Sequence, residues 1–216
     1  MGEVLDNEDD YYSMITTFTA MPIDLMLELD DMGIDYTKIT DYELFLLLFP
    51  GFKQGNTSLI FSGLNLDNFS LDFNKESKMP ILIDHESGVV IDKGIYWQVA
   101  ATLRRINHLK KNNRKPANDE AKKYMLERAR IKRNRHKKTS SVSNIEGLIV
   151  ALVNNCNFKY NFNETLGLTI YQFNESLQQL IKKDSYDNLM HGVYSGTVDA
   201  KKLNKDELNW LVHEQV

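Results

Sequence analysis

Residues 69–92 read FSLDFNKESKMPILIDHESGVVID, and this stretch decides the fold class. Its first five residues alternate apolar and polar side chains, a period of two that is typical of a β-strand. Two apolar runs, ILID and VVID, flank the tetrapeptide HESG at 85–88, whose glycine suits the left-handed position of a hairpin turn. We therefore expect a small antiparallel sheet of three or four strands between residues 57 and 92, with SLIFSG at 58–63 as its first strand.

Patterns of helical period flank the predicted sheet on both sides. Before it, Pro22 suits the first turn of a short helix that ends at Gly33. Thr40, with Glu43 three residues later, forms a capping box that opens a second helix, and Pro50 with Gly51 is expected to end it. After the sheet, apolar residues recur every three or four positions from Ile95 onward. Three strands need a cover over their apolar face, and flanking helices supply it, which predicts an α+β fold.

Composition and pattern divide the chain into four expected parts. These are an acidic arm at 1–12, an α+β part with the small antiparallel sheet and short helices at 13–93, an amphipathic helix running into a basic helical segment at 94–138, and a C-terminal helical part at 139–216. The last part begins within KKTSSVS at 137–143, a sequence typical of a linker. Its first helix opens with Ser143 and Glu146 as a second capping box. We expect a helical bundle in the C-terminal half, with one helix that ends at a glycine-rich stop, Gly192 or Gly196. Asn204 then caps a last helix at 205–214.

The basic charge of the chain is concentrated in one segment. Residues 104–138 hold fifteen Lys and Arg against three acids, a net charge of +12. Because the whole chain carries −4, the other 181 residues carry −16. A field this polarised favours a partner, either nucleic acid or an acidic surface, or a return of the segment onto the acidic part of its own chain.

Nucleic acid stays open as a partner, because Lys and Arg along a helix neutralise phosphates. Tyr124 is, however, the only aromatic residue of the predicted basic helix, and no helix-turn-helix, zinc-finger or RNP pattern accompanies it. The sequence pI of about 5.8 also means that the acidic remainder repels phosphate at long range. An acidic protein surface, on a neighbouring copy in a homo-oligomer or on another protein, is the favoured partner.

A group of carboxylates in the predicted N-terminal helices is the candidate counterpart within the chain. They lack the order of a calcium loop, so a solvated face or a counterpart for the basic segment is favoured over a metal site. The residues are Asp24, Glu28, Asp30, Asp31, Asp35, Asp41 and Glu43.

The sequence contains no catalytic or cofactor-binding motif that we can identify. The five histidines are dispersed, and GxSxG, P-loop, GxGxxG and zinc-ligand spacings do not occur. We expect a protein that is not an enzyme and that uses no cofactor and no metal. The acidic start does not resemble a secretory signal, and the longest apolar runs are too short to cross a bilayer, so we expect no membrane partner.

Six residues are the candidates for partner binding. Five lie on the predicted basic helix, because Tyr and Arg are frequent anchors of protein interfaces. The sixth is a tryptophan near the C-terminus, for which docking into the core remains the alternative. The residues are Tyr124, Arg128, Arg130, Arg133, Arg135 and Trp210.

Residues 166–196 read LGLTIYQFNESLQQLIKKDSYDNLMHGVYSG and follow an acidic start, a small β region and a charged helix. This order resembles uncharacterised proteins of tailed bacteriophages that infect low-GC Gram-positive hosts, and in layout it is similar to tail assembly chaperones. The resemblance implies a non-enzymatic tail or virion assembly protein. Its partner would be a phage structural protein, the tape measure or a neighbouring tail subunit, met in the host cytoplasm or in the virion.

Overall fold

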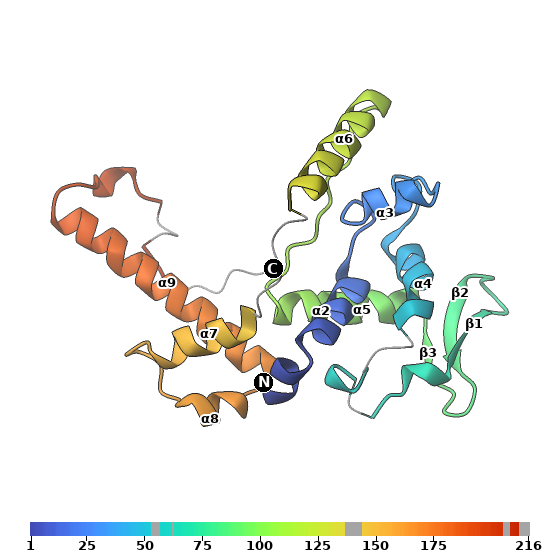
Figure 1. Ribbon diagram of the computed structural model, residues 1–216, viewed down its shortest axis with the longest axis horizontal. Coiled ribbons are helices and arrows are strands. Elements are labelled where there is room, and N and C mark those ends of the chain that lie inside the picture. The colour runs from blue at the N-terminus through green and yellow to red at the C-terminus, as the bar shows by residue number, and fades with distance from the viewer. Residues whose placement is uncertain (53–56, 62, 137–143, 205–207, 212–216) are drawn as a thin grey trace. The chain divides into compact units, whose positions relative to one another are not determined.

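The computed structural model describes residues 1–52, 57–61, 63–136, 144–204 and 208–211 (Figure 1). The chain forms two compact units with separate cores. The first, which we call the sheet unit, comprises residues 6–104 and 110–142. The second, the helical unit, comprises residues 1–5, 105–109 and 143–216.

The sheet unit holds a three-stranded antiparallel sheet in the order β1-β2-β3. Strand β1 (Phe69–Phe73) pairs with β2 (Pro80–Asp84), and β2 pairs with β3 (Val90–Ile91). Gly88, in the turn between β2 and β3, has a φ of 72°, a conformation that a side chain would strain. The hairpin and its left-handed glycine are therefore confirmed.

Helices supply the cover that the sheet needs, and three of them share an aromatic core. The ring of Phe45 lies 4.9 Å from that of Phe18 and 4.7 Å from that of Tyr96, and all three side chains are fully buried. These rings come from α4, α2 and α5, so one cluster joins elements from three parts of the sequence. The helices of this unit are α2 (Glu8–Thr19), α3 (Met26–Asp31), α4 (Asp41–Phe52), α5 (Lys93–Ile106) and α6 (Asp119–His136).

Tyr42 fixes α4 to the sheet. Its hydroxyl lies 2.9 Å from the carbonyl oxygen of Pro80 and 3.2 Å from that of Ile91, and it donates to both. Burial raises the pKa of Tyr42 to about 12, so the hydroxyl remains a donor at neutral pH. The expected capping box at the start of α4 is present, since the Glu43 carboxylate accepts from the Thr40 backbone and the Thr40 hydroxyl accepts from the Glu43 backbone. The expected α+β fold is confirmed.

Residues 3–12 are helical, although a solvated arm was expected there. Helix α1 (Gly2–Asp6) buries Val4, and α2 buries Tyr11 and Met14. The carboxylates in the first turn of α2 lie at the positive end of the helix dipole, where negative charge is favourable. The expectation was wrong because it weighed the charge of the stretch above the three- and four-residue spacing of its apolar side chains.

Three other expectations also differ from the structure. No strand forms among the described residues of 58–63, and 3₁₀ helix η1 (Thr57–Leu59) lies there instead, because so short an apolar run does not distinguish a strand from a helical turn. The helix predicted to start near Pro22 begins at Met26 after a turn. Pro50 was expected to stop α4, but the helix continues to Phe52. A second 3₁₀ helix, η2 (Leu66–Asn68), leads into β1.

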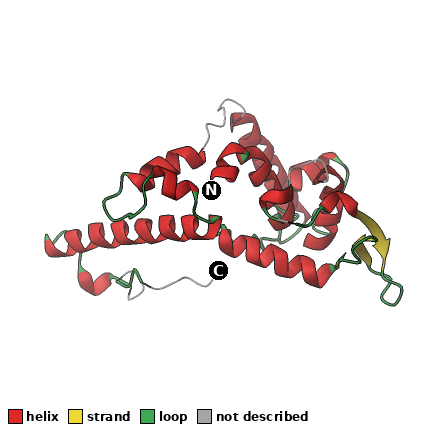
Figure 2. Ribbon diagram, turned by 90° about the horizontal axis from the view of Figure 1, so that it is seen from below, coloured by secondary structure: helices red, strands yellow, loops and turns green. Residues whose placement is uncertain are grey.

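The helical unit is built from α7 (Asn144–Val153), α8 (Phe162–Leu166) and α9 (Ile170–Tyr194), with 3₁₀ helix η3 (Ala200–Lys202) after them (Figure 2). Its core includes Ile149, Leu152, Thr165 and Phe173, all buried. Both α8 and α9 begin with a capping box, Asn161 with Glu164 and Thr169 with Gln172. Such boxes satisfy backbone donors that a helix start leaves free, which explains two abrupt starts within ten residues.

The chain turns back on itself at the end of α9. The Gly192 carbonyl accepts from the backbone N–H groups of Thr197 and Val198, both at 3.0 Å, and Gly196 has a φ of 75°. The expected glycine-rich stop is therefore confirmed. Of the helix predicted at 205–214, residues 208–211 are described and form turns and coil. The predicted linker at 137–143, with its Ser143 cap, lies outside the described residues.

Candidate partner-binding surface

Helix α6 carries the basic segment and begins with a side-chain cap. The Asn118 side-chain oxygen accepts from the Ala121 backbone N–H at 2.8 Å, which satisfies one of the free donors of the first turn. Asp119 and Glu120 in that turn are favourable beside the positive end of the helix dipole. The following run of residues with good helix propensity continues to His136.

One side of α6, which we call the inner face, packs on the apolar core of the sheet unit. Leu126 is 8% exposed and belongs to a cluster with residues of the N-terminal helices, while Met125 and Ala129 pack against that cluster. The sequence of this helix, with few apolar residues among many bases, predicts burial on only one narrow side, and this prediction is confirmed. The other members of the cluster are Ala20, Ile23, Leu27, Leu29, Tyr36 and Leu44.

Arginines at the edge of the inner face pair with the acids of α3. Arg130 Nη2 lies 2.6 Å from Asp30 Oδ2 and 3.4 Å from Asp31 Oδ1. Arg133 Nη1 lies 3.3 Å from Asp31 Oδ2 and 3.9 Å from Glu28 Oε1. All of these side chains are more than a third exposed, so each pair contributes only about 0.2–1 kcal/mol. These pairs therefore fix the orientation of α6 on the sheet unit but contribute little to the free energy of its packing.

Lys122, about two turns closer to the start of α6 than Arg130, makes a more enclosed pair. Its ammonium group donates to Asp35 Oδ1 at 2.6 Å and lies 5.6 Å from the ring centre of Tyr36. The hydrogen bond from Lys122, with further bonds from Thr37, holds the pKa of Asp35 well below its usual range. The same bond raises the pKa of Lys122. Both groups are therefore charged at neutral pH.

The segment before α6 makes a further acid–base contact, at the buried carboxylate of Asp41. Lys111 Nζ donates to Asp41 Oδ2 at 3.1 Å, and the Trp97 indole N–H donates to Oδ1 at 3.1 Å. Burial is the largest single influence on the pKa of Asp41 and raises it. The hydrogen bonds from Trp97 and Lys111, with the charge of Lys111, outweigh burial, so the pKa lies below its usual value.

The N-terminal carboxylates therefore act as a counterpart of the basic segment within the chain, as one of the sequence interpretations expected. Asp30, Asp31, Asp35 and Asp41 each pair with a base of that segment. Asp24 accepts from the Asn112 side chain at 2.7 Å instead. In the part of the chain that the structure describes, no group of three or more His, Cys, Asp or Glu is arranged to hold a metal ion.

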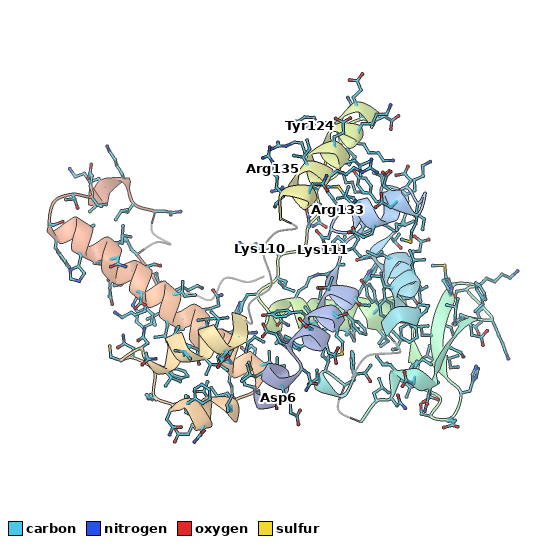
Figure 3. All side chains as sticks on the ribbon, viewed as in Figure 1. Asp6, Lys110, Lys111, Tyr124, Arg133 and Arg135 are labelled. Carbon is cyan, nitrogen blue, oxygen red and sulfur yellow. The ribbon has the colours of Figure 1, made fainter. Side chains whose placement is uncertain are left out.

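The opposite side of α6 carries what we call the outer stripe: Tyr124, Arg128, Ile131 and Arg135. Positions spaced by four, three and four residues share one helix face. Tyr124 is 58% and Ile131 52% exposed, and the Arg128 guanidinium lies 5.7 Å from the Tyr124 ring centre. In Figure 3, Tyr124 and Arg135 lie on the side of α6 away from α3, and Arg133 lies toward α3. The two arginines of the stripe have no ion pair with the described residues.

The structure thus separates the six predicted site residues into three groups. Arg130 and Arg133 contact acids of their own chain, whereas Tyr124, Arg128 and Arg135 remain on the exposed face. Trp210 belongs to the helical unit, where it is half-buried. Its carbonyl accepts from the Gln179 side chain at 3.3 Å, and Lys183 Nζ lies 5.6 Å from its ring centre.

The sequence analysis did not include Ile131 among the site residues. It also did not predict the contact between Trp97 and Asp41. Helical spacing from Tyr124 and Arg128 was the signal that could have added Ile131. The contact between Trp97 and Asp41 joins residues 56 positions apart, and no local pattern indicates it.

The comparisons with known proteins relate the C-terminal part of the chain to phage proteins. A family model described as the YomV second domain matches residues 135–215, from the end of α6 through α7, α8 and α9. This is a phage-derived domain of the Bacillus prophage kind, which supports the expected bacteriophage association. No curated protein and no solved structure matches the chain. None of the helices in the described ranges is long and apolar enough to cross a membrane.

Proposed function

We propose that the protein is a non-enzymatic assembly protein of a phage tail or virion, which acts through protein–protein contact. The observation that carries this proposal is the outer stripe of α6. A tyrosine, an isoleucine and two arginines lie exposed together, after the acids of the same chain have paired with the inner face. The phage-derived domain in residues 135–215 supports the biological setting.

The chemistry of the stripe selects an acidic protein surface with apolar side chains as its partner. Arg128 and Arg135 can each bind a carboxylate through two parallel hydrogen bonds. Tyr124 and Ile131 supply the apolar area that a stable interface needs at its centre. A phage structural protein with an acidic helical face, the tape measure or a neighbouring tail subunit, fits this description.

The test is a pull-down of the tagged chain from phage-infected cells, followed by identification of the captured proteins. We expect capture of a phage tail or virion protein, and loss of that protein when Arg128→Glu and Arg135→Glu are combined. The double variant Lys201→Glu and Lys202→Glu changes net charge equally at exposed residues of the other unit and serves as the control. Equal recovery by both double variants would refute the outer stripe as the contact.

Nucleic acid remains a second candidate because four exposed bases, Lys123, Arg128, Lys132 and Arg135, lie along α6 outside the pairs with α3. Four phosphate contacts predict that log K falls with log salt at a slope of about −3 to −4. Oligonucleotide titration at two salt concentrations measures that slope. No binding at low salt would eliminate this candidate, whereas a steep slope with both duplex and single strands would favour it over protein contact.

A further inference from the structure

A cavity of about 380 Å³ lies within the sheet unit, beside the segment that leads into α6. One wall is formed by residues 21–23 and 36–41, and the other by residues 111–116. Trp97 of α5 also lines the cavity. The volume falls in the range of ligand pockets, about 300–1,000 Å³.

The buried carboxylate of Asp41 fixes the two walls to each other. It accepts from the indole N–H of Trp97 and from the ammonium group of Lys111, each at 3.1 Å. Both partners line the cavity, and Trp97 remains 48% exposed. A flat aromatic surface is therefore held in one orientation at the cavity before any ligand arrives, which reduces the entropy cost of binding.

The cavity is strongly basic. Its lining includes Lys38, Lys111, Arg114 and Lys115 against one acid, Asp41. Lys111 is neutralised by Asp41, and Lys38 lies 3.8 Å from Asp35. The side chains of Arg114 and Lys115 are exposed and have no acidic partner among the described residues. Two uncompensated positive charges therefore lie on the same wall of the cavity and favour an anion.

Tyr36 adds a polar group without a partner. Its side chain lines the cavity and is 4% exposed, and its hydroxyl makes no hydrogen bond within the described residues. Leaving such a group unpaired is unfavourable, because it loses its hydrogen bond to water and gains none in return. Burial raises the pKa of Tyr36, so the hydroxyl is protonated at neutral pH and can donate. A ligand with acceptor atoms can recover this cost.

We propose that this cavity binds a nucleoside phosphate, with its base against the exposed ring of Trp97 and its phosphate groups on Arg114 and Lys115. Stacking of a base on an aromatic side chain is favourable and tolerates any base, because every base has a flat π-face. Arginine matches the geometry of phosphate oxygens, and lysine adds a point charge. A free nucleotide and the 5′-phosphorylated end of a strand share this chemistry. An acidic peptide would use the two cations but would leave the indole without a flat partner.

Tryptophan fluorescence reports directly on this cavity, because Trp97 and Trp210 are the only tryptophans. In the Trp210→Phe variant of the full chain, Trp97 is the sole reporter. The probes are thymidine, thymidine mono- and triphosphate, inorganic phosphate, a 5′-phosphorylated oligothymidine and an oligoglutamate peptide. We expect saturable quenching by the nucleotides, tighter with each added phosphate and at least about tenfold weaker with thymidine.

Variants separate binding in the cavity from general attraction to a basic protein. Arg114→Gln combined with Lys115→Gln should weaken nucleotide binding at least about tenfold, with the circular dichroism spectrum unchanged. Lys201→Gln combined with Lys202→Gln removes the same charge from exposed residues of the helical unit, outside the cavity lining, and should leave binding unchanged. Tighter binding of the oligothymidine than of the monophosphate would assign the end of a strand as the ligand.

Four results would overturn the proposal. They are an absence of saturable quenching at millimolar nucleotide, equal affinity for thymidine and its phosphates, equal affinity for the oligoglutamate peptide or inorganic phosphate, and equal weakening by the two double variants. The outcome is independent of the outer stripe, because none of its four residues lines the cavity.

Discussion

Helices α6 and α9 are the longest helices of the described chain, with 18 and 25 residues, and they are anchored in opposite ways. Each has one buried side chain among those described, Leu126 in α6 and Phe173 in α9. Leu126 lies near the middle of its helix, and the acids that pair with α6 lie 87 to 105 residues earlier. Phe173 lies in the first turn of α9, whose end is held by the chain that immediately follows.

This difference shows that one buried side chain can be sufficient to hold a long helix in place when other contacts restrict its orientation. Those contacts can come from residues far away in the sequence or from neighbouring residues. For α6 they are exposed ion pairs, each worth about 0.2–1 kcal/mol. For α9 they are a capping box and the backbone hydrogen bonds to Gly192. In both helices most of the free energy should come from the buried side chain, because burying it contributes about 1.5–3 kcal/mol.

Phe173→Ala should give the largest effect. Phe173 is 1% exposed, and removing a buried phenyl ring costs about 3–5 kcal/mol in the free energy of unfolding. Urea denaturation followed by circular dichroism measures the loss. Ile181→Ala is the control on the same helix, because this side chain is 49% exposed and its truncation should change the free energy by less than about 0.5 kcal/mol. Similar losses for the two variants would mean that α9 is not anchored at its first turn.

Leu126→Ala makes the corresponding change in α6. We expect a loss of about 2–3 kcal/mol, at the lower end of the usual range because Leu126 retains 8% exposure. Hydrogen exchange of the α6 amides should accelerate together with the global loss. Ile131→Ala, on the outer stripe, should leave both quantities nearly unchanged. If Ile131→Ala were the more damaging variant, the inner and outer faces would be assigned the wrong way round.

The turn after α9 is tested by Gly192→Ala. A Cβ at Gly192 would lie 2.8 Å from Cγ2 of Val198, so the turn must move, and over-packing of this kind costs about 1–3 kcal/mol. Gly147→Ala in α7 meets no atom within 4 Å and should instead stabilise by about 0.5–1 kcal/mol through helix propensity. Opposite signs in thermal denaturation are expected. Val198→Ala should rescue Gly192→Ala, and a failure to do so would place the cost elsewhere.

The sequence was most informative where structure is decided locally. The hairpin with Gly88, the capping box of Thr40 and Glu43 and the stop after α9 depend on residues within six positions of one another. The single apolar side of α6 also follows from its own spacing. These features are set by backbone geometry and nearby hydrogen bonds, so neighbouring residues suffice to predict them.

For the candidate site, the sequence could predict which residue types take part but not which residues contact each other. The sequence shows that acids and bases are separated along the chain, but not that Arg130 meets Asp30 or that Asp41 joins Trp97 to Lys111. These pairs are set by tertiary packing of residues 56 to 100 positions apart. For the same reason the division of the basic helix into a paired and an unpaired face was not foreseen.

The arginines on the two faces of α6 provide a smaller test of that division. Arg130→Gln with Arg133→Gln should cost about 1 kcal/mol at low salt, and the cost should shrink at 1 M salt, where exposed pairs are screened. Arg128→Gln with Arg135→Gln removes the same charge and should change the free energy of unfolding by less than about 0.5 kcal/mol at either salt concentration. A salt-independent cost for the first pair would mean that packing of the side chains, and not charge, orients the helix.

The smallest effect is confined to acid pH and concerns the pair of Asp35 and Lys122. Because the folded pKa of Asp35 lies below its unfolded value of about 3.9, the pair stabilises fully above that value and is lost as pH falls through the folded pKa. The pKa of Lys122 is raised above its unfolded value of about 10.4, so at alkaline pH the pair stabilises fully up to about pH 10.4. This contribution is lost only as the pH rises through the folded pKa of Lys122. The free-energy difference between the protein and Asp35→Asn, measured by urea denaturation, should therefore be constant from about pH 5 to 9 and shrink toward pH 2. A difference that persists undiminished in acid would show that the Asp35 carboxyl acts through its bonds to Thr37 and not through its charge.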